Sequence, residues 1–371
     1  MRQASFPKSL TVLQRGLEER LHAGAQLYVS RDNRVLADVA IGESSEGIPM
    51  SVDTLMLWRS STKPIVAVAI ALLVERGRLS LTEPVARWIP EFAVHGKERI
   101  QLEHLLTHTA GLRSADLSLN ETMEWNAALN VIIESRPEPR TGPGAQAGYH
   151  LNSTWYLLGE IIRRVDGRDC GRFVREEVFE PLHMNDCWIG MTPKQYREYG
   201  RRIGAMHVRE DGVLQPHPFL DSEKACSLCQ PGSNGRGPIR ELGKFYEHLL
   251  TARTQHSDSR TSILKPETAE RWTSRQRVGM TDQTFRHQID WGYGFIIDSN
   301  RYGKETVPYG YGRLCSESTF GHSGSQSSCA FADPEHDLVV AWVCNGMPGE
   351  AAHQRRAREL NSAIYEDLGL A

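Results

Sequence analysis

Long apolar runs are missing from this sequence of 371 residues. No stretch reaches the ~18 consecutive apolar residues that a helix needs to cross a bilayer. The first residues, MRQASFPKSL, also lack the continuous apolar segment of ~7–15 residues that marks a secretory signal. We therefore expect a cytoplasmic protein that does not enter a membrane.

A strong charge of one sign and a cysteine framework are missing as well. The formal net charge is −3, which gives no electrostatic reason to expect nucleic acid or an anionic membrane as a partner. The 7 cysteines are odd in number and dispersed, which argues against a disulfide scaffold. One close pair, Cys226 and Cys229, has neither a second pair nor a nearby histidine to complete a zinc site. We expect no metal.

What the sequence does contain is a serine and a lysine at the start of an apolar segment. Ser60 and Lys63 form an S-x-x-K pattern, whose spacing places both side chains on one face of a helix. Residues 65–74 are almost all Ala, Val, Ile or Leu, which predicts a helix that runs through the interior. Burial lowers the pKa of a lysine, so a neutral Lys63 amine could accept the hydroxyl proton of Ser60. Backbone N–H groups at the helix start would stabilise an oxyanion nearby.

The S-x-x-K pattern by itself is a weak signal. It also occurs at Ser5 and Ser262, and an alternative reading is that Ser60 caps the helix while Lys63 extends to the surface. Ser5 lies near the chain end, and Ser262 leads into a charged segment typical of a surface helix. Since Ser60 alone precedes a segment predicted to be buried, it is our candidate nucleophile.

Hydrophobic periodicity indicates that the two ends of the chain build one domain. Amphipathic helices and strand-like runs occur near both ends, at residues 9–21, 25–30, 35–41, 291–297, 328–332, 338–343 and 357–368. The long segment between them shows mostly helices and loops. We predict a sheet domain from residues 1–85 and 281–371, a mostly helical insertion at 86–280, and an active site between the two.

Two further clusters carry polar side chains. His104 and His108 lie four residues apart, a spacing used by metal ligands, but no third ligand is evident and a packing or capping role is favoured. Tyr149, His150 and Asn152 follow a loop rich in proline and glycine, where polar side chains are well placed for a cleft. Each of these three residues could equally be a packing or helix-capping residue.

A third cluster, Phe320-Gly-His-Ser-Gly-Ser325, precedes the last predicted hairpin. Its glycines allow close backbone approach, and His322 supplies a group that can handle a proton. Alone, the segment is an ordinary strand edge.

Taken together, these segments resemble the serine β-lactamase-like superfamily, which includes penicillin-binding proteins, class C β-lactamases, D-aminopeptidases and related esterases. The matching segments are S-x-x-K at 60–63, GRLSL at 77–81, HLLTHTAGL at 104–112, H-x-G at 322–324, ADP at 332–334 and VCN at 343–345. The resemblance covers nearly the whole chain. It implies an α/β (α+β) fold like that of β-lactamases and transpeptidases, with an antiparallel sheet flanked by helices and an inserted, mostly helical domain.

The second motif of that superfamily is Y-x-N, and here the sequence departs from it. The usual spacing places His150 where the tyrosine should stand, two residues before Asn152, whereas Tyr149 comes one residue early. A similar Tyr-His pair in esterase relatives favours Tyr149 as the base. His150 stays an alternative, because a histidine titrates near neutrality whereas a tyrosine base needs a strongly lowered pKa.

The resemblance implies acyl transfer in two steps, in which Ser60 attacks a carbonyl and water or another acceptor later releases the acyl group. Lys63 and Tyr149 would shuttle the proton, and no metal or organic cofactor is implied. Backbone N–H groups of Ser60 and Ser325 would form the oxyanion hole. The substrate-binding and oxyanion positions implied by the motifs are Asn152, His322, Gly324 and Ser325.

The third motif bears on the substrate class. In the β-lactamases and transpeptidases that the chain resembles, a lysine there helps to bind the substrate carboxylate, whereas His322 would be mostly neutral at pH 7. We therefore favour a small carboxylic ester as the substrate. A D-aminopeptidase or other amidase, a weak β-lactamase, and a non-catalytic binding or sensor module stay open as alternatives, as does the oligomeric state.

Overall fold

A computed structural model describes residues 6–138, 142–253 and 262–370. Its main feature is an antiparallel sheet of 8 strands in the order β11-β12-β13-β14-β15-β1-β2-β3. The strands are β1 (Gly24–Arg31), β2 (Arg34–Ser45), β3 (Ile48–Pro49), β11 (Asp290–Trp291), β12 (Ile296–Ile297), β13 (Phe320–Gly324), β14 (Ser328–Asp333) and β15 (Leu338–Cys344). Because β1 pairs directly with β15, the two ends of the chain share one sheet.

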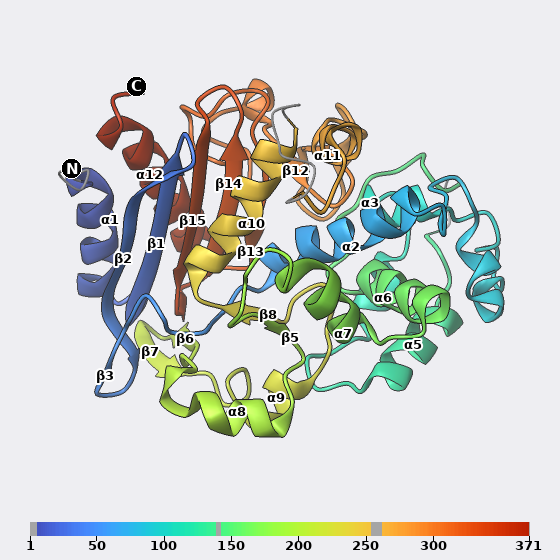
Figure 1. The fold of residues 1–371 in the computed structure, drawn as a ribbon, viewed down its shortest axis with the longest axis horizontal. Helices are drawn as coiled ribbons and strands as arrows, with labels where there is room; N and C mark the ends of the chain where they lie inside the picture. Colours follow the sequence, from blue (N-terminus) through green and yellow to red (C-terminus); the bar gives the residue numbers. More distant parts are fainter. Residues whose placement is uncertain (1–5, 139–141, 254–261, 371) are drawn as a thin grey trace.

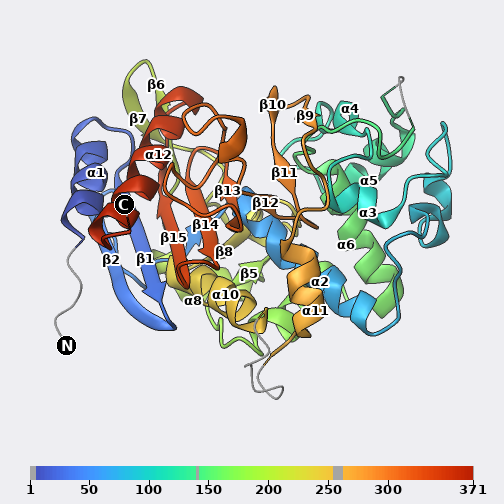
Figure 2. The same ribbon diagram turned by 90° about the horizontal axis from the view of Figure 1, so that it is seen from above.

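Helices cover both faces of this sheet. α1 (Pro7–Glu18) and α12 (Glu350–Asp367) lie side by side on one face, and α10 (Ile239–Ala252) lies on the other (Figures 1 and 2). Alternate residues of β15 enter the two cores, with Val340 and Trp342 on the α1/α12 side and Val339 and Ala341 on the α10 side. This two-sided burial explains why the strand is continuously apolar.

The hairpins agree with the sequence prediction. β1 and β2 are joined by Asp32 and Asn33, whose φ angles of 53° and 56° fit the two-residue turn that matches strand twist. β14 and β15 pair as expected. The predicted strand at 291–297 is instead two short strands, β11 and β12, because the chain reverses at Gly294 with a φ of 80°.

The predicted interior helix is α2 (Lys63–Glu75), which follows a 3₁₀ turn at Ser60–Thr62. Every residue from Lys63 to Leu73 is buried, so the apolar run does mark an interior helix. The remaining helices are α3 (Leu102–Leu106), α4 (Arg113–Asp116), α5 (Trp125–Glu134), α6 (Ser153–Asp166), α7 (Cys170–Val174), α8 (Pro193–Tyr199), α9 (Glu223–Ser227) and α11 (Pro266–Thr273). α6, α7 and α11 contact α2.

Eight short strands form three small sheets outside the main one. They are β4 (Met56–Leu57), β5 (Trp188–Ile189), β6 (His207–Glu210), β7 (Val213–Pro216), β8 (Gly235–Gly237), β9 (Thr281–Asp282), β10 (His287–Gln288) and β16 (Gly346–Met347). The division into a sheet domain and an insertion at 86–280 stays a prediction. α10 bears on it, because this helix belongs to the predicted insertion yet packs on the sheet.

Candidate active site

Ser60 and Lys63 lie together at the start of α2. The Lys63 Nζ atom is 3.1 Å from Ser60 Oγ and donates hydrogen bonds of 2.8 Å to two backbone carbonyls, those of Leu151 and Gly232. Both side chains are enclosed, with Ser60 9% exposed and Lys63 fully buried. The alternative in which Lys63 extends to the surface does not match this geometry.

The environment of Lys63 favours a neutral amine. Burial holds the pKa of Lys63 well below its usual value; the charge of Asp116 opposes this shift and that of Arg59 adds to it. A neutral amine has two N–H bonds and one lone pair. The two carbonyls take the N–H bonds, so the lone pair is left for the hydroxyl of Ser60.

The backbone before Ser60, the candidate nucleophile, is held in an unusual conformation. Arg59 has φ 52° and ψ −135°, a region that costs a residue with a side chain about 1–3 kcal/mol. Its carbonyl accepts hydrogen bonds from the backbone N–H and the hydroxyl of Thr62, at 3.0 and 2.6 Å. These bonds fix the tight turn that presents Ser60 at the helix start.

Tyr149 lies beside Ser60, the candidate nucleophile. Both residues line the same cavity, and the Lys63 Nζ atom lies 5.1 Å from the centre of the Tyr149 ring. Burial raises the pKa of the Tyr149 hydroxyl, and the neighbouring Ser60 side chain opposes that shift. The ring packs between Phe285 and Trp291, with centroid distances of 4.9 and 5.7 Å.

His150 faces the interior instead. Its Nε2 atom accepts a hydrogen bond from the backbone N–H of Leu112 at 2.8 Å, and its Nδ1 atom lies 3.3 Å from Nδ1 of His108. Burial lowers the pKa of His150 to about 3. The structure thus brings Tyr149 to Ser60, whereas both ring nitrogens of His150 face internal partners.

Asp116 is a functional candidate that the sequence reasoning missed. Its carboxylate accepts hydrogen bonds of 2.7–2.9 Å from the backbone N–H groups of Leu151, Asn152 and Ser153. This arrangement orients the turn whose Leu151 carbonyl holds Lys63. No local pattern marks Asp116, because its partners are backbone groups 35–37 residues further along the chain.

Asn152 is the last predicted member of the second motif. It stands at the N-cap of α6, and its Oδ1 atom accepts a hydrogen bond from the Ser233 hydroxyl at 3.1 Å. Ser233 follows Gly232, whose carbonyl binds Lys63. Asn152 therefore connects the two backbone segments that flank the lysine.

The third motif lies on β13, beside the nucleophile. His322 is 1% exposed; its Nδ1 atom lies 2.7 Å from the Ser323 carbonyl, and its Nε2 atom has no partner within the described ranges. Burial lowers the pKa of His322 to about 3, so the ring is neutral and Nε2 presents a lone pair. A Cβ on Gly324 would lie 2.3 Å from the Trp58 carbonyl oxygen, so only glycine allows β13 to approach the segment before Ser60.

These side chains open onto a cavity of about 410 Å³. Ser60, Tyr149, His322 and Ser325 line one part of it. The other lining residues are Leu151, Thr284, Phe285, Ile296, Pro308, Tyr309, Ser323, Glu350 and Gln354. Leu151, Phe285, Ile296 and Pro308 make part of the wall apolar, and a chamber of this size and mixed composition fits a small organic substrate.

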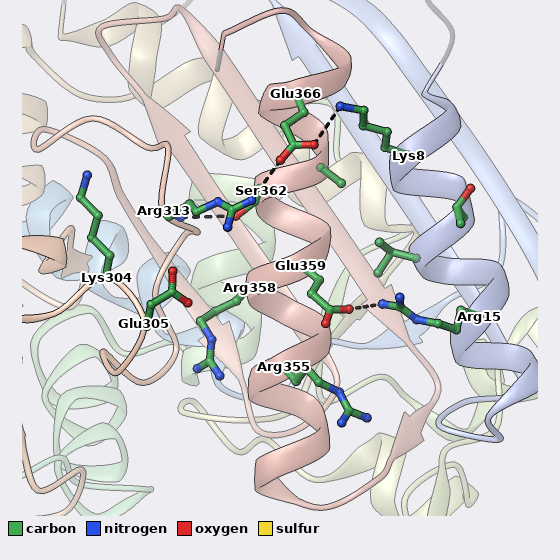
Figure 3. Close-up of a pocket in the computed structure, with 13 residues that line it drawn as sticks. Lys8, Arg15, Lys304, Glu305, Arg313, Arg355, Arg358, Glu359, Ser362 and Glu366 are labelled. Carbon is green, nitrogen blue, oxygen red and sulfur yellow. Dashed lines mark hydrogen bonds and ion pairs between the residues drawn. The ribbon is translucent and has the colours of Figure 1, made fainter.

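A larger cavity, of about 590 Å³, lies between α1 and α12, and its lining is mostly charged rather than apolar. Figure 3 shows that charged side chains line it, with Arg15 paired with Glu359, and Lys8 and Arg313 paired with Glu366. None of the predicted site residues lines it.

The other sequence candidates lie apart from this site. Ser262 donates its hydroxyl to the Leu264 carbonyl, and Ser5 falls outside the described residues. His104 accepts the backbone N–H of Gln101 through Nδ1 in a helix-capping interaction, as favoured from the sequence. Cys226 and Cys229 are free thiols.

The described part of the chain contains neither a candidate metal site nor a candidate membrane span. Across residues 6–138, 142–253 and 262–370, no group of three or more His, Cys, Asp or Glu side chains is placed to hold a metal ion. Within the same ranges, no helix combines the length and the apolar character needed to cross a membrane.

An S-x-x-K serine beside a buried lysine, next to an antiparallel sheet flanked by helices, is typical of the serine hydrolases of the β-lactamase and transpeptidase fold. The chain belongs to the beta-lactamase family, whose model matches residues 11–364. The resemblance inferred from the motifs and the predicted fold class are both confirmed.

Individual relatives agree with this assignment. The chain is 32% identical to "Esterase EstB" of Burkholderia gladioli over 312 residues, which cover 77% of each chain. It is 29% identical to "Esterase/beta-lactamase LipL" of Mycobacterium tuberculosis over 363 residues, covering 88% of this chain and 78% of the relative. The crystal structure of a penicillin-binding protein homologue from Caulobacter crescentus superimposes with a TM-score of 0.76 at 28% identity, covering 98% of this chain and 97% of that one.

Proposed function

We propose that this serine hydrolase cleaves small carboxylic esters through an acyl-enzyme on Ser60, or transfers the acyl group to an acceptor other than water. One observation carries the proposal. Lys63 is buried, two backbone carbonyls accept its N–H bonds, and the lone pair of the neutral amine faces Ser60 Oγ at 3.1 Å. A nucleophile and its base within hydrogen-bond reach is the arrangement that covalent catalysis requires.

The directions of the two pKa shifts indicate that Lys63 acts as the base and Tyr149 as the acid. Burial lowers the pKa of the Lys63 amine and raises that of the Tyr149 hydroxyl, so the proton of the resting pair stays on the tyrosine. Lys63 then accepts the proton of Ser60 as the bond from Oγ to the substrate carbonyl carbon forms. Tyr149 donates its proton to the departing alkoxide, and Lys63 returns a proton to the tyrosine. Deacylation by water follows the reverse path.

Two backbone N–H groups would bind the developing oxyanion. They belong to Ser60 and Ser325, which both line the cavity. Gly324 supports this role, because the close approach of β13 to Trp58 brings the Ser325 segment beside the nucleophile. Donors fixed in place before the reaction lower the barrier without reorganising.

The cavity favours esters over substrates that carry a carboxylate. The chain has His322 where related β-lactamases and transpeptidases have a lysine, and burial keeps that ring neutral. No lysine or arginine is among the lining residues of the described cavity. The similarity to two proteins named as esterases points the same way.

An amidase or a weak β-lactamase on this scaffold is the second candidate, since one relative is named "Esterase/beta-lactamase". A non-catalytic sensor would be acylated without turnover. The division of the chain into two domains with the site between them, and the cytoplasmic location, stay predictions. The oligomeric state stays open.

Covalent labelling tests the proposal directly. Intact-mass analysis after treatment with a fluorophosphonate should show one adduct on the wild-type protein and on Ser262→Ala, and none on Ser60→Ala. Hydrolysis of p-nitrophenyl esters should follow the same pattern. Full activity in Ser60→Ala would refute the proposal, and a stable acyl adduct without turnover would instead support the sensor. Hydrolysis of nitrocefin at rates that match the esters would favour the β-lactamase.

A further inference from the structure

The cavity that contains Ser60 also contains one carboxylate, Glu350, in the first turn of α12. This side chain is exposed. Its two oxygens accept hydrogen bonds from the Tyr309 hydroxyl, at 2.8 and 2.7 Å. The proposed reaction uses neither residue, so the role of Glu350 must be sought in binding.

Glu350 has no cationic partner among residues 6–138, 142–253 and 262–370. Arg59 acts electrostatically on Tyr309 and Tyr149, but it does not line the cavity and pairs with Glu121 at 3.8 Å. The two histidines beside this region do not add positive charge, because burial lowers the pKa of His322 and of His353. Glu350 is therefore the only charged side chain among the described residues that line the cavity.

Aromatic rings lead from the nucleophile to this charge. Tyr149 lines the cavity beside Ser60, and its ring centre is 4.9 Å from that of Phe285. The Phe285 ring centre is 5.7 Å from that of Tyr309, whose hydroxyl donates to Glu350. Pro308 and Ile296 complete the apolar wall. Aromatic faces attract cations, so the path to Glu350 accommodates an apolar chain that ends in a positive group.

We propose that Glu350 selects substrates in which an ammonium group is separated from the reactive carbonyl by an apolar spacer. The inference rests on the proposed function, because it assigns a substrate class to the same Ser60 site. Glu350 attracts the ammonium group through its negative charge, and the Tyr309 hydroxyl orients its carboxylate. No lysine or arginine among the described lining residues competes with the substrate for that carboxylate. Substrates with a carboxylate at the same end are repelled.

Isosteric ester pairs test this assignment. Each pair consists of two p-nitrophenyl esters whose acyl chains end in trimethylammonium or in tert-butyl, groups of the same shape that differ in charge. Spacers of three, five and seven methylenes cover the reach from Ser60. For at least one spacer, kcat/KM of the wild-type protein should be about fivefold higher for the cationic ester, mainly through KM, as expected for a partly exposed charge pair.

Two variants decide whether Glu350 is responsible. Glu350→Gln should lower the cationic-to-neutral ratio to about one, and 1 M NaCl should lower the wild-type ratio by screening the charge. Glu359→Gln is the matched control, since it removes a carboxylate from the same helix but lines the other cavity, and it should keep the wild-type ratio. Circular dichroism and thermal melting confirm that both variants are folded.

The result separates this inference from the proposed function. No cationic preference at any spacer length, or the same preference in Glu350→Gln as in the wild type, would overturn the role of Glu350 while hydrolysis of the neutral esters still supported catalysis by Ser60. If no ester of either kind acylates Ser60, the proposed function fails first.

Discussion

The Nε2 atom of His150 accepts a hydrogen bond from the backbone N–H of Leu112 at 2.8 Å. The lone pair that a general base would need is therefore already engaged inside the protein. Tyr149, the preceding residue, instead lines the cavity together with Ser60. Two adjacent residues that the sequence left as alternatives thus occupy different environments, and this difference leads to the first prediction.

Tyr149→Phe should reduce the acylation rate about a hundredfold or more, because it removes the hydroxyl proposed to donate the leaving-group proton. His150→Gln should retain acylation within a few fold, since a glutamine oxygen can still accept the Leu112 N–H. Alcohol release from an unactivated alkyl ester reports the rate, because an alkoxide needs the proton whereas p-nitrophenolate would leave without it. An active Tyr149→Phe together with an inactive but folded His150→Gln would reverse the assignment.

Lys63→Met removes the amine and keeps the length of the side chain. We expect at least about a hundredfold loss of kcat/KM, the lower end for a lost general base. Wild-type activity should rise with pH as the amine loses its proton, and the midpoint should lie well below the ordinary lysine value because of burial. A pH profile of kcat/KM checks this, and near wild-type rates in Lys63→Met would make the residue structural.

Asp116→Asn should impair catalysis without touching the nucleophile. The asparagine amide would place its own N–H bonds against the backbone N–H donors of the turn, so the turn at Leu151 would lose hydrogen bonds. The Leu151 carbonyl that accepts from Lys63 would then shift. We expect about a tenfold lower kcat and about 1–3 kcal/mol lower stability, the cost of unsatisfied buried donors. Asp169→Ala, which removes the N-cap of α7, is the control for a loss of stability alone. Unchanged kcat in Asp116→Asn would contradict the positioning role.

Acid should destabilise the fold through its buried histidines. Burial lowers the pKa to about 3 in His22, His150 and His322. Unfolded histidines bind protons at about pH 6.5, so between pH 6.5 and 3 the unfolded state holds more protons and stability falls as pH falls. Each such histidine contributes a slope of about 1.4 kcal/mol per pH unit in that window.

His150→Gln isolates one of these contributions. Between pH 6.5 and 5 the wild type should lose about 2 kcal/mol more of unfolding free energy than the variant does, as measured by urea titration at both pH values. The exposed residue His183, replaced by asparagine, should keep the wild-type slope. Equal slopes in wild type and His150→Gln would show that His150 titrates normally.

The sequence alone was sufficient for features that depend on local spacing. The three-residue interval between Ser60 and Lys63 fixes both on one turn, and the uninterrupted apolar run after Lys63 could only be accommodated in the interior. The continuous apolar run at 338–343, which follows the turn formers at 333–337, likewise made β15 recognisable. The exception was the segment at 291–297, where Gly294 reverses the chain within what looked like one strand.

The tertiary structure decided what depends on packing between distant segments. Lys63 is held by the carbonyls of Leu151 and Gly232, and backbone carbonyls carry no residue-type signal in a sequence. The same holds for Asp116, whose backbone partners lie more than thirty residues away. Local spacing determines which side chains share a turn of helix. Which of two neighbours, Tyr149 or His150, faces the nucleophile depends on how the chain enters α6 against α4 and β13, and only the assembled fold fixes that.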